Sequence, residues 1–274
     1  MSAPVARARV DLDATAERLE RLGMSYVAGR LAEHLAEASS QDLPAHRFLD
    51  RLLDAELAER EQRRIRTSLR LSGLPTGQTL GNFDFAFQPA IERSRIETLA
   101  TCAWIRSHET LLIQGPPGVG KTHLAVALGV KAVENGFSVL FIRLEELIAA
   151  LKRDAELPAS RLRRRKYLNV ALLIIDEMGF EPLDRRAASL FFRLVSYRYG
   201  RGSILITTNK GIKDWPELLA GDEVLATAIL DRLLHHSHVI NIKGRSYRLR
   251  DLEQAISLRC PEPCTTTSHT ATGA

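Results

Sequence analysis

Hydrophobic residues recur at helical spacing through the first seventy positions of the chain. Val27, Leu31 and Leu35 repeat every four residues with charged positions between them, which predicts an amphipathic helix. Pro44 suits the first position of a following helix. The apolar positions of that helix form one stripe made of Phe48, Leu49, Leu52, Leu53 and Leu57. This part of the chain is therefore expected to form a small all-α domain.

Beyond position 110 the pattern changes to short apolar runs that alternate with helical segments. The strands predicted from these runs cover residues 111–114, 138–142, 171–175, 203–207 and 239–242. A run such as 171–175 is apolar on both faces, which is typical of parallel strands covered by helices. The alternation predicts a doubly wound α/β fold, in which ligands bind beyond the carboxyl ends of the strands.

Composition marks the borders of these two parts. Residues 72–77 are rich in Ser, Gly, Pro and Thr, as linkers are. We therefore expect a helical domain over residues 1–76 and an α/β domain over 77–258. Residues 259–274 are rich in Thr and Pro and are expected to form a disordered tail. Cys260, Cys264 and His269 of that tail are three ligands without a fourth, which argues against a zinc site.

The overall composition is that of a globular protein, with 45% hydrophobic and 26% charged residues. No apolar stretch approaches the roughly 18 residues of a membrane-spanning helix, and the N-terminus lacks the apolar core of a secretory signal. The three cysteines offer no disulfide framework. These features predict a cytoplasmic protein with no membrane partner.

The basic residues of the chain, whose net charge is +5, gather in three stretches at 60–70, 161–166 and 245–250. Nucleic acid is one explanation, because phosphate contacts dominate its affinity for proteins. Solvated helix faces give the same pattern. Charge alone leaves both readings open.

The most informative motif is Gly-Pro-Pro-Gly-Val-Gly-Lys-Thr at residues 115–122, which fits the phosphate-binding pattern G-x-x-x-x-G-K-[ST]. It follows a predicted strand and leads into a helical pattern, so its backbone N–H groups can surround phosphate oxygens at a helix N-terminus. Lys121 would reach the β- and γ-phosphates of a nucleoside triphosphate, and the Thr122 hydroxyl would hold Mg²⁺. The residues predicted to bind the nucleotide are Gly115, Pro116, Pro117, Gly118, Val119, Gly120, Lys121 and Thr122.

Two further strand ends carry polar residues toward the same edge of the sheet. Asp176 follows a buried apolar run and would bind Mg²⁺ opposite Thr122, while Glu177 would orient and deprotonate the attacking water. The pairing with the glycine loop predicts hydrolysis of the nucleotide as well as binding. Asn209 can hydrogen-bond the γ-phosphate or the water from the next strand, although Asn at a strand end is also a common turn former.

Two arginines near the end of the α/β domain are further candidates. Arg232 lies in a helical segment, and Arg248 follows the last predicted strand. Either could stabilise charge on the transferred phosphoryl group. In a basic chain, however, most arginines of this kind are surface charges.

Taken in order, the motifs GPPGVGKT, LLIIDE, ITTN and ILDRLL…SYRLR resemble those of AAA+ ATPases of the IstB/DnaC-like branch. The helical N-terminal region looks like that of the transposition helper proteins of IS21-family insertion sequences. The resemblance covers roughly residues 10–255 and implies an AAA+ P-loop fold that binds ATP and Mg²⁺. It also implies a homo-oligomer, double-stranded DNA as a ligand and a transposase as a partner.

The resemblance also assigns roles to single residues. Asn209 matches sensor 1, and Arg232 matches the arginine finger that acts on the nucleotide of a neighbouring subunit. Arg248 matches sensor 2, although Arg245 and Arg250 are close enough to be alternatives. Residues 82–85 lie where this family approaches the adenine. The basic stretch 161–166 lies where initiator-type members insert a helical element that faces DNA.

The function implied is that of an ATP-dependent, DNA-binding helper of transposition. It would oligomerise on duplex target DNA, hydrolyse ATP between subunits and recruit or stimulate the transposase. The alternative within the same branch is a DnaC-like loader of a replicative helicase. A metabolic P-loop kinase is a third class, which would need a second acceptor pocket and would not need Arg232 to act in trans.

Overall fold

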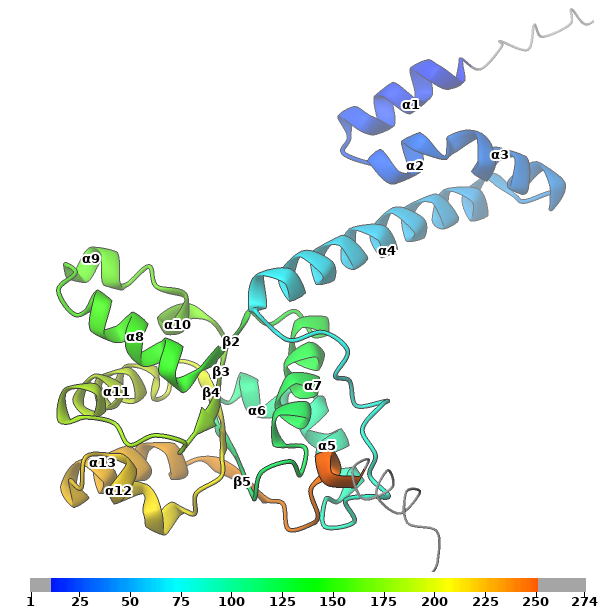
Figure 1. The fold of residues 1–274 in the computed structure, drawn as a ribbon. Coiled ribbons are helices and arrows are strands. Elements are labelled where there is room, and N and C mark those ends of the chain that lie inside the picture. The colour runs from blue at the N-terminus through cyan, green and yellow to red at the C-terminus, as the bar shows by residue number, and fades with distance from the viewer. Residues whose placement is uncertain (1–10, 251–274) are drawn as a thin grey trace, which may run out of the picture. The chain divides into compact units, whose positions relative to one another are not determined.

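The computed structural model describes residues 11–250 of the chain (Figure 1). The predictions for the end of the α/β domain at 251–258, for the tail at 259–274 and for its cysteines lie outside the described residues. By its internal contacts the chain divides into two compact units, residues 1–68 and 69–274. The domain border after residue 76 stays a prediction.

The first unit is helical, with α1 (Leu12–Arg21), α2 (Ser25–Gly29), α3 (Leu31–Ser40) and the start of α4 (Ala45–Ser72). The Asp11 carboxylate caps α1 by accepting the backbone N–H groups of Asp13 and Ala14. Pro44 stands just before α4, where its carbonyl accepts the N–H of Phe48.

The predicted apolar stripe of α4 is only partly buried. Leu52 is buried, whereas the side chains of Leu49, Leu53 and Leu57 are exposed. The buried side of the helix continues from Leu52 to Glu56, four residues later, and the Glu56 carboxylate accepts the backbone N–H groups at the start of α2. The helix interface thus includes a carboxylate with hydrogen-bond partners, which an apolar stripe does not predict.

The second unit contains one parallel five-stranded sheet in the order β2-β3-β4-β1-β5. Each strand lies close to its predicted position. The bounds are β1 (Thr110–Gln114), β2 (Val139–Arg143), β3 (Leu172–Met178), β4 (Ser203–Thr208) and β5 (Ser237–Asn241). The predicted α/β fold with a parallel sheet is therefore confirmed.

Helices cover both faces of this sheet (Figure 1). The main helices are α5 (Arg93–Ala100), α7 (Lys121–Glu134), α8 (Leu144–Asp154), α11 (Arg185–Arg198) and α13 (Glu223–Leu234). The short ones are α6 (Ala103–Arg106), α9 (Ala159–Leu162), α10 (Lys166–Asn169), α12 (Trp215–Leu218) and the 3-10 turn η1 (Ile212–Asp214).

The central strand β3 is buried on both faces, as its sequence predicts. Leu173 and Ile175 join the core beneath α8, α11 and α13. Ile174 points to the opposite face, where its Cδ1 would lie 2.7 Å from a Cβ on Gly129 of α7. Among residues 11–250, no helix has both the length and the apolar character needed to cross a membrane.

Candidate active site

The glycine loop connects β1 to α7 and is enclosed by two other segments of the chain. Gly118 and Gly120 have φ angles of +81° and +96°, a region that favours glycine. A Cβ on Gly118 would lie 2.0 Å from the Ser246 hydroxyl oxygen, and one on Gly120 would lie 2.8 Å from the ring of Phe83. Both glycines are therefore required for the loop to take this shape in this place.

Lys121, the first residue of α7, folds back over the loop. Its ammonium Nζ donates to the carbonyl oxygens of Gly115 and Pro116, each at 2.8 Å. Burial lowers the pKa of Lys121 from its ordinary value, Asp176 acts in the opposite direction, and Arg248 lowers it further. A partly buried cation beside a second cation favours an anionic ligand, which fits the phosphates predicted for this loop.

Thr122 and Asp176 meet beside the loop, as predicted. The Thr122 hydroxyl lies 3.0 and 3.2 Å from the two carboxylate oxygens of Asp176, which is buried. The Thr207 hydroxyl donates to the same carboxylate. A hydroxyl and a carboxylate are the oxygen ligands that Mg²⁺ prefers. Within residues 11–250, no three His, Cys, Asp or Glu side chains gather to hold a metal.

Glu177 is adjacent to Asp176 in sequence, but its side chain is partly exposed, whereas Asp176 is buried. The pairing of β3 with β4 shifts register between Ile175 and Met178, and Glu177 takes a φ of +63°. Its backbone N–H donates to the Thr207 hydroxyl oxygen at 3.1 Å, while its side chain is 44% exposed. This irregularity directs the carboxylate toward the cavity.

Asn209 follows β4 at the same edge of the sheet. Its side-chain oxygen Oδ1 is buried and has no hydrogen-bond partner within the protein. Gly179 allows this approach, since a Cβ there would lie 2.6 Å from that oxygen. A buried acceptor without a protein partner is suited to a donor from outside, such as a water molecule.

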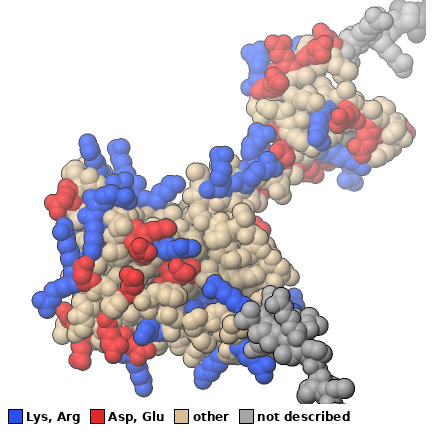
Figure 2. Space-filling view, in the orientation of Figure 1, with Lys and Arg blue, Asp and Glu red and all other residues tan. Residues whose placement is uncertain are grey.

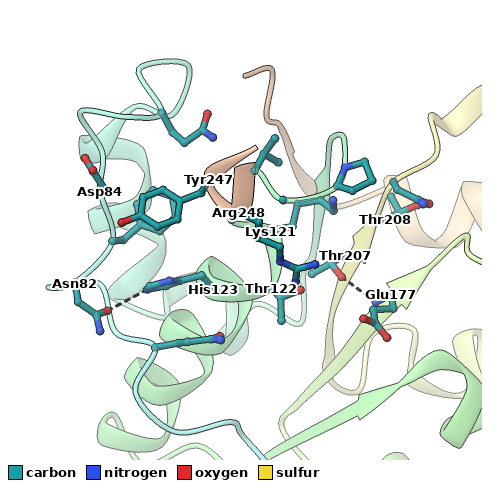
Figure 3. A pocket seen from close by; sticks show the side chains of 18 of the residues that line it. Asn82, Asp84, Lys121, Thr122, His123, Glu177, Thr207, Thr208, Tyr247 and Arg248 are labelled. Atoms are coloured by element: carbon teal, nitrogen blue, oxygen red, sulfur yellow. Dashed lines mark hydrogen bonds between the residues drawn. The ribbon is translucent and has the colours of Figure 1, made fainter. Parts of the chain in front are cut away.

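Gly118, Gly120, Lys121, Thr122, Glu177 and Asn209 line one cavity of about 290 Å³, and the buried Asp176 lies behind Thr122 (Figure 3). Sequence reasoning did not find several of its other lining residues, which include Gln78, Gln88, His123, Phe180, Thr207 and Tyr247. The ring nitrogen Nε2 of His123 lies 2.9 Å from the Thr79 carbonyl and 3.1 Å from Asn82 Oδ1, and so it ties the preceding segment to α7. A single histidine after the glycine loop gave no signal of this role.

Of the three arginines considered for sensor 2, the structure brings Arg248 to the cavity, where it lies near Lys121 (Figure 3). Arg250 instead donates to the Asp84 carboxylate at 3.0 Å and lies over the rings of Phe87 and Tyr247. Arg245 does not line the cavity.

Arg232 lies apart from the glycine loop of its own chain. Its guanidinium donates to the Ala228 carbonyl at 2.8 Å and stacks over the Phe192 ring. It lines a different cavity of about 260 Å³, near the amino ends of β1 and β4. The structure thus does not bring Arg232 together with the other predicted site residues.

The chain is similar to known proteins over most of its length. A family model of IstB-like ATP binding proteins matches residues 17–255. The ATP-binding protein of insertion sequence IS21 from Pseudomonas aeruginosa is 47% identical over 239 residues, which are 86% of this chain and 89% of that protein. The corresponding protein of insertion sequence IS5376 from Geobacillus stearothermophilus is 41% identical over 86% of this chain and 93% of its own length.

Solved structures show the same fold at lower identity. A DNA replication initiation factor aligns with a TM-score of 0.52 and 19% identity over 68% of this chain and 56% of that one. DnaI aligns with a TM-score of 0.50 and 21% identity over 65% of this chain and 94% of its own. The fold is thus that of AAA+ P-loop proteins, and the predicted family resemblance is confirmed: the chain belongs to the family of IstB-like ATP-binding proteins.

Proposed function

We propose that this protein is an ATP-dependent, DNA-binding helper of transposition that hydrolyses ATP between subunits of a homo-oligomer. The observation that supports this most directly is the incomplete site within one chain. Lys121, Glu177 and Asn209 line the cavity, whereas Arg232 lies elsewhere on the same subunit. A second copy would supply the missing arginine, which is the logic of an arginine finger acting in trans.

Within one subunit, each residue has a role that follows from its position. Lys121 and Arg248 neutralise phosphate charge, and Thr122 and Asp176 would hold Mg²⁺. Mg²⁺ bound there would supply positive charge to the β- and γ-phosphate oxygens. Glu177 accepts a proton from the attacking water, and the Asn209 amide holds that water or the γ-phosphate in place.

The basic stretch at 161–166 supports contact with DNA backbone phosphates. Arg161, Arg163 and Arg164 are exposed, and Figure 2 shows basic side chains gathered over the region of α8 to α10. Arg165 differs from them, because it forms an ion pair with the buried Asp154 at 2.5 Å. The contact is therefore assigned to Arg161, Arg163 and Arg164.

The names of the relatives support a setting in transposition, since they are ATP-binding proteins of insertion sequences. A transposase of the same element is accordingly the proposed partner. The likeness to DnaI extends to the fold alone. We find no observation that favours the helicase loader or the kinase considered from the sequence.

The experiment that tests this function is the ATPase rate against protein concentration, with and without duplex DNA. The wild type is expected to show a steep concentration dependence that duplex DNA increases. Glu177→Gln is expected to bind ATP but to lose hydrolysis. A specific activity that is flat in concentration and indifferent to DNA would contradict the proposal.

A further inference from the structure

Gln88 closes one end of the nucleotide cavity, on the side away from the hydrolytic residues. In the sheet, β1 lies between β4 and β5. Glu177 is on β3 and Asn209 follows β4, so both residues lie on one side of the glycine loop. Gln88 contacts the segment that follows β5, on the other side. If the γ-phosphate lies toward Glu177, the base of the nucleotide lies toward Gln88.

The amide of Gln88 has one fixed orientation. Its nitrogen Nε2 donates to the Arg245 carbonyl oxygen at 2.9 Å, and because that oxygen only accepts, the amide cannot be flipped without losing this bond. The side chain is only 2% exposed. Its oxygen Oε1 can therefore only accept a hydrogen bond.

That oxygen has no partner within the protein. It packs so closely against Gly244 that a Cβ there would lie 2.2 Å from it. Gln88 lines the cavity together with the aromatic rings of Phe83 and Tyr247. A buried acceptor without a partner is costly, so a ligand that brings a donor to it is favoured over one that does not.

We propose that Gln88 reads the nucleotide base, by accepting a hydrogen bond from the 6-amino group of adenine at Oε1. A purine with a 6-oxo group, such as guanine or hypoxanthine, would place an acceptor against this acceptor and leave both oxygens unsatisfied. This inference rests on the proposed binding of ATP in this cavity and adds the residue that selects the base.

Gln78 provides a matched comparison. Its Oε1 is also buried without a partner and it lines the same cavity. In the described part of the chain, however, no hydrogen bond fixes its amide. Gln78 can therefore turn its amide to offer a donor or an acceptor, and it does not discriminate between the two kinds of purine.

The test is competition against a ribose-labelled fluorescent ATP, using the full chain and three competitors: ATP, inosine triphosphate and the triphosphate of unsubstituted purine riboside. The wild type is expected to bind ATP at least about tenfold more tightly than inosine triphosphate, with unsubstituted purine between them. Gln88→Met should reduce the ratio of ATP to inosine triphosphate affinity to about one to two, chiefly by weakening ATP. Gln78→Met should keep the wild-type ratio.

Equal binding of ATP and inosine triphosphate by the wild type would overturn the assignment of Gln88 alone, and so would a wild-type ratio in a folded Gln88→Met. The ranking of the three competitors on the unmodified chain tests the proposal even if the variant does not fold. If inosine triphosphate bound as tightly as the triphosphate of unsubstituted purine riboside, this ranking would overturn the proposal. Failure of the wild type to bind any of the three would instead contradict the proposed ATPase itself.

Discussion

Arg143, the last residue of β2, forms an ion pair with Glu177, with 3.5 Å between Nε and Oε2. The carboxylate proposed to activate water is thus held by a cation on the neighbouring strand. Both side chains are substantially exposed, so the pair can open when the site is completed. Such a contact would restrain hydrolysis in an isolated subunit.

Removal of this arginine is expected to release Glu177. Arg143→Ala should raise the ATPase rate measured without DNA by about two- to fivefold, because an exposed ion pair contributes little more than that to a barrier. The affinity for ATP should not change. Lys152→Ala, which breaks the exposed ion pair with Asp184, is the control and should leave the rate unaltered. An equal or lower rate for Arg143→Ala would contradict the restraining role.

The basic stretch should control the salt dependence of DNA binding. Reversing two exposed charges, Arg163→Glu with Arg164→Glu, is expected to weaken duplex binding and to lower the slope of log affinity against log salt by about 2. The control is the double variant Arg185→Glu with Arg201→Glu, which makes the same change in net charge. Arg185 is on α11, and Arg201 follows it. An unchanged slope in the first variant, measured by fluorescence anisotropy, would remove this stretch from the DNA contact.

The N-terminal unit should lose stability in acid through Glu56. Burial alone would raise the pKa of this carboxyl, but hydrogen bonds from Val27, Arg60 and Tyr26 outweigh it and place the pKa below its ordinary value of 4.5. A lowered pKa in the folded state stabilises the unit above about pH 4.5, and this contribution is lost as the pH falls through the lowered value.

Glu56→Gln should therefore cost about 1–3 kcal/mol at neutral pH and flatten the loss of stability in acid. Hydrogen exchange of the Tyr26 and Val27 amides measures it directly, because both donate to Glu56. Glu20→Gln, an exposed change on α1, is the control. Exchange rates that match between the Glu56 and Glu20 variants across this pH range would show that the buried carboxylate contributes nothing.

The α/β unit should depend on Arg198, whose side chain is 1% exposed at the end of α11. Its guanidinium donates to the carbonyls of Tyr167, Val170, Ala171 and Ser203, and burial lowers its pKa to about 10. Arg198→Met leaves these acceptors without their donor and should cost about 3 kcal/mol or more.

Tryptophan fluorescence during denaturant unfolding reports this loss, because both tryptophans, Trp104 and Trp215, are buried in that unit. The exposed Arg193→Met on the same helix should change stability by less than about 0.5 kcal/mol. A similar unfolding midpoint for the two variants would argue that water replaces the Arg198 guanidinium without penalty.

The sequence predicted the sheet and the edge at which the site lies, because continuous apolar runs identify parallel strands and parallel strands place their carboxyl ends together. It therefore brought Thr122, Asp176 and Asn209 to one place. It did not predict the bulge that separates Glu177 from Asp176, since the register of β3 against β4 depends on pairing between distant residues. The choice of Arg248 over Arg250 depended likewise on a carboxylate far away in sequence, Asp84.

The pattern of apolar and polar positions also could not predict the roles of polar residues whose hydrogen-bond partners are distant in the chain. Glu56 occupies the side of α4 where leucines were expected, because its hydrogen bonds come from α2. Gln88 gained its fixed orientation from the carbonyl of a residue 157 positions later. Spacing alone carries no information about such contacts.

The central claim, that each site is completed by the arginine of a neighbouring subunit, is tested most directly by mixing two inactive variants. Arg232→Ala retains Glu177, and Glu177→Gln retains Arg232. In an equal mixture, about one quarter of the interfaces would join an intact Glu177 to an intact Arg232. We predict that each variant alone hydrolyses no ATP and that the mixture regains up to about that fraction of the wild-type rate. A mixture no more active than its two components would contradict the shared site.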